Sequence, residues 1–181
     1  MKRSFWIALA LPSMAALLLA QPVREPDRPT LQELQSEIQS ELESHGDRVM
    51  GQEAYRWSTR LEGISGCRVE LRVRATNHIG EKTVHEDRIR FSLGAIERYR
   101  IGWQKRWLAL PCAGHEKCIS TVSTCTKTTK DGIVVDCSSR SEKREESLSL
   151  QFDGDAAAAS RLERDFRQAV ELCHEAAPVS F

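Results

Sequence analysis

The sequence predicts an α+β fold in which seven antiparallel strands lie between an N-terminal and a C-terminal helix. Apolar residues recur every three to four positions over residues 30–46 and 155–174, which is the period of an amphipathic helix. Between these segments, short runs alternate apolar and polar residues and are separated by turn residues, a pattern typical of half-buried strands. Strands and helices do not alternate along the chain, so we do not expect a parallel sheet.

The N-terminus resembles a secretory signal peptide. Lys2 and Arg3 precede an apolar run of 17 residues that ends at Ala20, and a transmembrane helix needs about 20 such residues. We therefore expect residues 1–20 to be removed by cleavage after Ala20, which makes the protein secreted or periplasmic. An uncleaved membrane anchor is the alternative. No later segment is apolar enough to predict a membrane span after cleavage.

Residues 21–29 contain three prolines among charged residues and predict an extended tether. Thr30 and Glu33 have the spacing of a capping box, which begins the helix at 30–46, and Gly46 is expected to end it. The apolar stripe consists of Leu31, Leu34, Ile38 and Leu42. Because this stripe is narrow, the helix must pack against something; we expect its own domain, with a partner protein as the alternative.

The strands predicted from the alternation cover residues 55–61, 67–76, 83–92, 106–112, 118–127, 133–139 and 146–153. Residues 93–105 are expected to be irregular, with a helical turn near 96–99. The strand at 118–127 is rich in serine and threonine and is expected to be exposed or at a sheet edge, with a glycan-binding face as the less favoured alternative. Asp155 can cap the last helix, whose apolar stripe is Leu162, Phe166, Ala169, Val170 and Cys173.

All six cysteines follow the predicted signal peptide, and an even number in an exported chain indicates disulfides. Residues 130–132 read Lys-Asp-Gly, which is typical of a three-residue hairpin loop. Such a loop places residue 129 opposite residue 133, and therefore Cys125 opposite Cys137. Directly opposed residues lie close enough for a disulfide.

The pairing of the other four cysteines is less well determined by the sequence, because six cysteines allow 15 connectivities. Cys112 and Cys118 flank five residues, so a local bridge is the simplest pairing. Subtraction leaves Cys67 with Cys173, both on predicted apolar faces. A zinc site formed by Cys112, His115 and Cys118, with Cys125 nearby, is the alternative. Export into an oxidising compartment argues against free thiolates, so we expect no metal.

Charge and motifs exclude several classes of protein. The chain has 26 basic and 26 acidic residues, and removal of Lys2 and Arg3 leaves a net charge of −2, which excludes a strongly basic nucleic-acid-binding protein. The five histidines are scattered, and no nucleophile-elbow, dinucleotide-binding or phosphate-binding loop motif is present. We expect neither an enzyme nor a cofactor; an exported hydrolase with an unrecognised site is the alternative.

One surface is unusually basic. Arg68, Arg72 and Arg74 share the outer face of the strand at 67–76, and Arg88 and Arg90 share that of the strand at 83–92. Tyr99, Trp103 and Trp107 follow among further basic residues. Such a face could hold an anionic ligand, an anionic envelope component or an acidic protein. The alternative is a cross-strand charge ladder in which Glu70 and Glu86 neutralise the arginines and the tryptophans belong to the core.

The segments RFSLGAI (90–96), WLALPC (107–112) and DGDAAAASRLERDFRQAVELC (153–173) resemble those of small pleckstrin-homology-like domains in exported bacterial proteins. The resemblance covers residues 53–174. It implies a seven-stranded sandwich or partly open barrel closed by the C-terminal helix, with a binding or scaffolding role. The loop at 63–66 lacks a basic cluster, so phosphoinositide binding is not implied.

These observations predict an exported, disulfide-stabilised binding module of the cell envelope, whose partner is a protein or an anionic envelope component. A purely structural envelope protein and the unrecognised enzyme are the alternatives.

Overall fold

The structure, a computed structural model, describes residues 28–50, 54–79 and 81–176. The predicted signal peptide and its cleavage site lie outside these ranges, as does the predicted tether up to residue 27. Within them the chain forms two α-helices and nine strands. Neither of these helices is long and apolar enough to cross a membrane.

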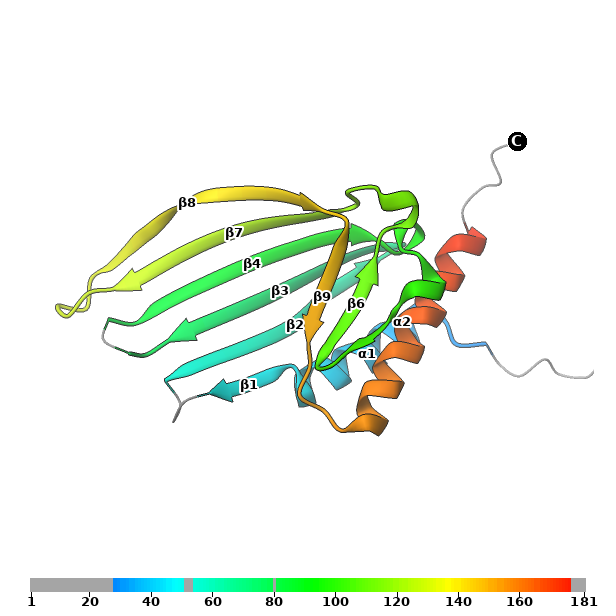
Figure 1. Ribbon diagram of the computed structural model, residues 1–181, viewed down its shortest axis with the longest axis horizontal. Helices are drawn as coiled ribbons and strands as arrows, with labels where there is room; N and C mark the ends of the chain where they lie inside the picture. The colour runs from blue at the N-terminus through cyan, green and yellow to red at the C-terminus, as the bar shows by residue number, and fades with distance from the viewer. Residues whose placement is uncertain (1–27, 51–53, 80, 177–181) are drawn as a thin grey trace, which may run out of the picture.

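Six strands form a large antiparallel sheet in the order β1-β2-β3-β4-β7-β8. They are β1 (Asp47–Met50), β2 (Tyr55–Ser65), β3 (Arg68–Asn77), β4 (Thr83–Ser92), β7 (Ile119–Thr128) and β8 (Val134–Glu145). Figure 1 shows that all of these strands except β1 are long and that the helices lie near only one end of the sheet. The opposite, distal end carries the exposed aliphatic side chains Val49, Met50, Ile79, Ile133, Val134 and Val135.

Three shorter strands form a second antiparallel sheet. They are β5 (Gly102–Gln104), β6 (Trp107–Pro111) and β9 (Ser147–Gln151), in the order β5-β6-β9. Strand β9 follows β8 after one residue and turns steeply away from it (Figure 1). The apolar residues of β6 and β9 share one core with those of β3 and β4. The two sheets therefore pack together at the end that the helices cover.

Helix α1 (Leu31–His45) begins at the predicted capping box. The Glu33 backbone N–H donates to Thr30 Oγ1 at 3.2 Å, and the Thr30 N–H donates to Glu33 Oε2 at 2.7 Å. Leu34, Ile38 and Leu42 are fully buried in the common core. The helix therefore packs against its own domain, as predicted.

Helix α2 (Ala156–Ala176) closes the core from the C-terminal side. Asp155 caps it by accepting a hydrogen bond from the Ala158 N–H at 2.8 Å. The predicted stripe of Leu162, Phe166, Ala169, Val170 and Cys173 is buried throughout. Asp165, one turn before Ala169, is also buried, and the sequence pattern did not indicate this.

The predicted α+β class, with an antiparallel sheet and a helix at each end, is confirmed, and the sheet does not close into a barrel. All seven predicted strands are present. Two short strands, β1 and β5, were not predicted, because four and three residues are too few to show an alternation. The pleckstrin-homology-like resemblance stays a prediction.

Two local predictions were wrong. Strand β2 continues through Gly63 to Ser65, with a register shift between Leu61 and Gly63, where a turn was expected. Strand β7 lies between β4 and β8 rather than at an edge. Serine and threonine side chains are tolerated in this central strand because the large sheet extends past the apolar core, so much of β7 is only half-buried.

The three predicted disulfides are all present: Cys67–Cys173, Cys112–Cys118 and Cys125–Cys137. The zinc alternative is thereby excluded for these cysteines. The loop at 130–132 forms as predicted, with Gly132 at φ 79° and the Thr129 N–H donating to the Ile133 carbonyl at 2.9 Å. A bulge then shifts the register, so Cys125 lies opposite Ser138. Cys137 is the extra residue, and its Cα still lies 5.3 Å from that of Cys125.

Candidate functional site

The five arginines predicted as an anion-binding face all lie exposed on the outer face of the large sheet, away from the common core. We call Arg68, Arg72, Arg74, Arg88 and Arg90 the arginine face. The register shows like charges directly opposite one another, because Arg60 of β2 faces Arg72 of β3, which faces Arg88 of β4. Such pairs are destabilising unless acidic neighbours or a partner offset them.

Glutamates offset three members of the arginine face. Arg72 Nε donates to Glu62 Oε1 at 2.6 Å, and Arg90 pairs with Glu70 at 2.8 Å. These hydrogen bonds raise the pKa of both guanidinium groups above the ordinary value. Arg88 lies 3.4 Å from Glu86. Much of the face therefore has the form of a charge ladder.

The aromatic residues expected beside these arginines lie elsewhere. Trp103 and Trp107 belong to β5 and β6 of the small sheet. The Trp103 indole N–H donates to the Ala159 carbonyl at 3.1 Å, which ties it to α2. The structure therefore does not bring the predicted arginine and aromatic residues together.

A different site lies on the inner face of the large sheet, where it meets the small sheet. This inner cleft has a volume of about 310 Å³, within the range of small-molecule sites. Its aromatic members are Trp57 of β2 and Trp107 of β6, and its polar members include Asp87 of β4, Thr121 and Ser123 of β7, and Lys143 of β8. Residues from five strands thus converge on one cleft.

The register explains why these side chains face inward. Val73, Asp87 and Ser123 lie side by side across β3, β4 and β7. Residues two positions along, including Ile89 of β4, continue the same face into the apolar core. Asp87 therefore occupies an inward position at the point where the core gives way to the cleft.

Several polar groups of the inner cleft have no partner among the described residues. Asp87 is half-buried and Lys143 is exposed, and neither forms an ion pair there. The buried indole N–H of Trp57 also has no acceptor in that part of the chain. An unsatisfied buried donor is costly. By contrast, three arginines of the arginine face already have partners.

Sequence reasoning did not single out Asp87 or Lys143. A signal was present, since His85 and Asp87 share the phase of Ile89 and Phe91, where a fully core-facing strand would be apolar. In the ranges that the structure describes, no group of three or more histidine, cysteine, aspartate or glutamate residues is arranged to hold a metal ion.

Comparisons with protein-family models, with curated proteins and with solved structures find no match to this chain.

Proposed function

We propose that the protein is an exported, non-catalytic binding module that holds a small polyhydroxylated ligand, of the sugar class, in the inner cleft. The observation that carries this proposal is the meeting in one cleft of two indole rings with Asp87 and Lys143, neither of which has an ion-pair partner within residues 28–50, 54–79 and 81–176. Export is supported by the three disulfides, which persist in oxidising compartments.

The chemistry of the lining favours hydroxyl groups as the ligand's polar atoms. Asp87 accepts hydrogen bonds, Lys143 donates them, and the Ser123 hydroxyl does both. The Thr121 hydroxyl already donates to Glu145 Oε2 at 3.3 Å, and its oxygen can still accept. A ligand hydroxyl can likewise donate and accept, so one type of group satisfies the whole set. The indole rings of Trp57 and Trp107 offer apolar surface with a polar tip, which suits the apolar face of a sugar ring.

Affinity for a panel of neutral mono- and disaccharides tests this proposal. Binding is measured by tryptophan fluorescence and calorimetry on the oxidised protein. For any saccharide that binds, Asp87→Asn and Trp107→Leu should each weaken the affinity about tenfold or more, since losing one charged hydrogen bond or one ring contact costs about 1–3 kcal/mol.

Glu142→Gln is the matched control. Glu142 lies on the same strand as Lys143 but accepts a hydrogen bond from Ser120 on the outer face, so its substitution should leave the affinity unchanged. Absence of binding across the panel, or equal affinities of the cleft and control variants, would contradict the proposal.

A second candidate function is binding of an anionic envelope surface by the arginine face. It is favoured by the column of Arg60, Arg72 and Arg88, in which like charges are held opposite each other on three neighbouring strands. Asp47, Glu62 and Glu86 each pair with one of these arginines, so an extended anionic surface would compete with these contacts for the guanidinium groups, and a flat sheet face can lie against it.

Retention on anionic vesicles of phosphatidylglycerol, compared with neutral phosphatidylcholine vesicles, tests the second function. Reversal of Arg72, Arg88 and Arg90 to glutamate should abolish the difference between the two vesicle types. Reversal of Arg100, Arg106 and Arg161, which are paired arginines outside the large sheet, changes the net charge equally and should preserve it. Unchanged retention of the first variant would rule this function out.

A further inference from the structure

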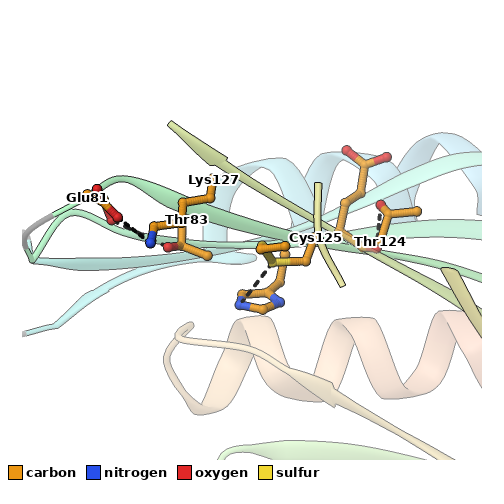
Figure 2. Close-up of a disulfide and its surroundings, with 8 residues drawn as sticks. Glu81, Thr83, Thr124, Cys125 and Lys127 are labelled. Atoms are coloured by element: carbon orange, nitrogen blue, oxygen red, sulfur yellow. Dashed lines mark hydrogen bonds and ion pairs between the residues drawn. A yellow bond between two sulfur atoms is a disulfide. The ribbon is translucent and has the colours of Figure 1, made fainter. Parts of the chain in front are cut away.

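The disulfide between Cys125 and Cys137 differs from the other two in its surroundings. Cys125 is 4 % exposed on the inner face of β7, whereas Cys137 is exposed on β8, the last strand of the large sheet. Cys137 is therefore the solvent-exposed member of the pair, and Cys125 is the enclosed one. Figure 2 shows Cys125 and its surroundings, including Glu81 and Lys127, which form an ion pair.

An imidazole lies against the enclosed sulfur. His85 of β4 is directly opposite Cys125 in the register, and its Nε2 lies 3.8 Å from Cys125 Sγ (Figure 2). Among the described residues no other histidine contacts a cysteine sulfur. A protonated imidazole at this position would stabilise a thiolate on Cys125, as cationic neighbours do for reactive cysteines.

We propose that Cys125–Cys137 is a thiol-exchange site that reacts with small-molecule thiols of the glutathione class. The incoming thiolate attacks the exposed sulfur of Cys137 and forms a mixed disulfide there. The bond between Cys125 and Cys137 breaks, and its electron pair leaves with Cys125 as a thiolate beside the His85 imidazole. The reverse attack by Cys125 on Cys137 expels the small thiol and restores the original bond.

The position of the disulfide lets it open without loss of the fold. Strands β7 and β8 remain paired on both sides of it, from Ile119 with Glu145 to Thr128 with Val134. The bridge also closes a short loop, with a sequence separation of 12, whereas Cys67–Cys173 has a separation of 106. Because a bridge across a shorter loop restricts the unfolded chain less, opening Cys125–Cys137 lowers the stability of the fold less.

The other two disulfides are suitable internal references. Cys67 and Cys118 are each only half-exposed, and neither Cys173 nor Cys112 has an imidazole against its sulfur. Cys112–Cys118 is the stronger competitor, because the Cys118 N–H donates to Cys112 Sγ at 3.2 Å and could also stabilise a thiolate.

The test incubates the oxidised protein with reduced glutathione under native conditions, alkylates free thiols at successive times and maps all six cysteines by mass spectrometry. We expect Cys125–Cys137 to open first, with glutathione on Cys137 and the alkyl group on Cys125. His85→Gln should slow this opening about threefold or more, because the leaving Cys125 thiolate loses its imidazole neighbour.

His78→Gln is the control, because His78 is an exposed histidine directly after β3 that makes no sulfur contact. It should leave the rate unchanged, and in both variants the rates of the other two disulfides should stay at the wild-type value, which reports an intact fold. Three results would each overturn the proposal: earlier or equal opening of Cys112–Cys118, glutathione found on Cys125, or a His85→Gln rate equal to wild type.

Discussion

At the scale of single residues, the alternation of the sequence identifies many core positions correctly. Val69 and Leu71 are fully buried, as their phase in the strand at 67–76 indicates. The same reasoning could not place Asp87, because phase gives the face of a sheet and not what covers that face. Whether an inward polar residue is buried or lines a cleft depends on where the small sheet ends. For Asp87 that is decided partly by β9, which begins 60 positions later in the sequence.

Gly46 is required at the end of α1 because the backbone around it leaves no room for a side chain. The residue ends α1 with φ −77°, which any amino acid adopts, but a β-carbon there would collide with the carbonyl oxygens of Leu42 and Thr59. We predict that Gly46→Ala lowers the free energy of unfolding by about 1–3 kcal/mol, the cost of overpacking. Gly63→Ala, whose β-carbon would meet nothing within 4 Å, is the control in denaturant titrations. Equal stability of the two variants would contradict this account.

Asp165 gives a pH-dependent prediction. Burial raises the pKa of its carboxyl, Glu37 and Glu41 of α1 add to this, and the hydrogen bond from Arg164 opposes it. Because the folded pKa lies above the unfolded value, stability from this group is greatest below the unfolded pKa and is lost as pH rises through the folded pKa. Asp165→Asn should therefore be more stable than wild type at neutral pH, with the difference shrinking towards pH 4 in denaturant titrations. A variant less stable at neutral pH would show that the pairing with Arg164 dominates.

At the scale of elements, hairpin geometry predicted a disulfide although the exact register was wrong. The loop at 130–132 fixed the pairing of its nearest neighbours, and Thr126 lies opposite Asp136 as expected. The bulge at Cys137 could not be foreseen from spacing, because a bulge changes the register without a clear sequence signal. The bridge forms despite it, since the bulged residue remains beside its neighbour.

The disulfides Cys67–Cys173 and Cys112–Cys118 should contribute unequally to stability. Cys67–Cys173 joins the turn before β3 to α2 across 106 residues, whereas Cys112–Cys118 spans 6. The chain-entropy relation gives about 4–5 kcal/mol for the first and about 2 kcal/mol for the second. Replacing Cys67 and Cys173 by alanine should thus destabilise the protein about twice as much as replacing Cys112 and Cys118, measured by denaturant unfolding. The opposite order would mean that native packing at the local bridge outweighs loop closure.

At the scale of the whole molecule, the sequence indicates strands but not how they divide between sheets. Strand β7 pairs with β4, although β5 and β6 of the small sheet come between them in the sequence. Strand β9 directly follows β8 of the large sheet but pairs with β6 of the small sheet. This division creates the inner cleft, so the cleft could not be predicted from any local pattern. The arginine face, by contrast, lies within neighbouring strands, and its placement on one outer face followed from alternation alone.

Binding in the inner cleft is most directly tested by NMR of the indole N–H groups while the saccharide panel is titrated into the oxidised protein. The described part of the chain contains three tryptophans, of which Trp57 and Trp107 line the cleft and Trp103 is hydrogen-bonded to α2 outside it. We predict that the indole resonances of Trp57 and Trp107 shift together while that of Trp103 stays in place. No shift with any saccharide, or a shift confined to Trp103, would contradict the proposed function.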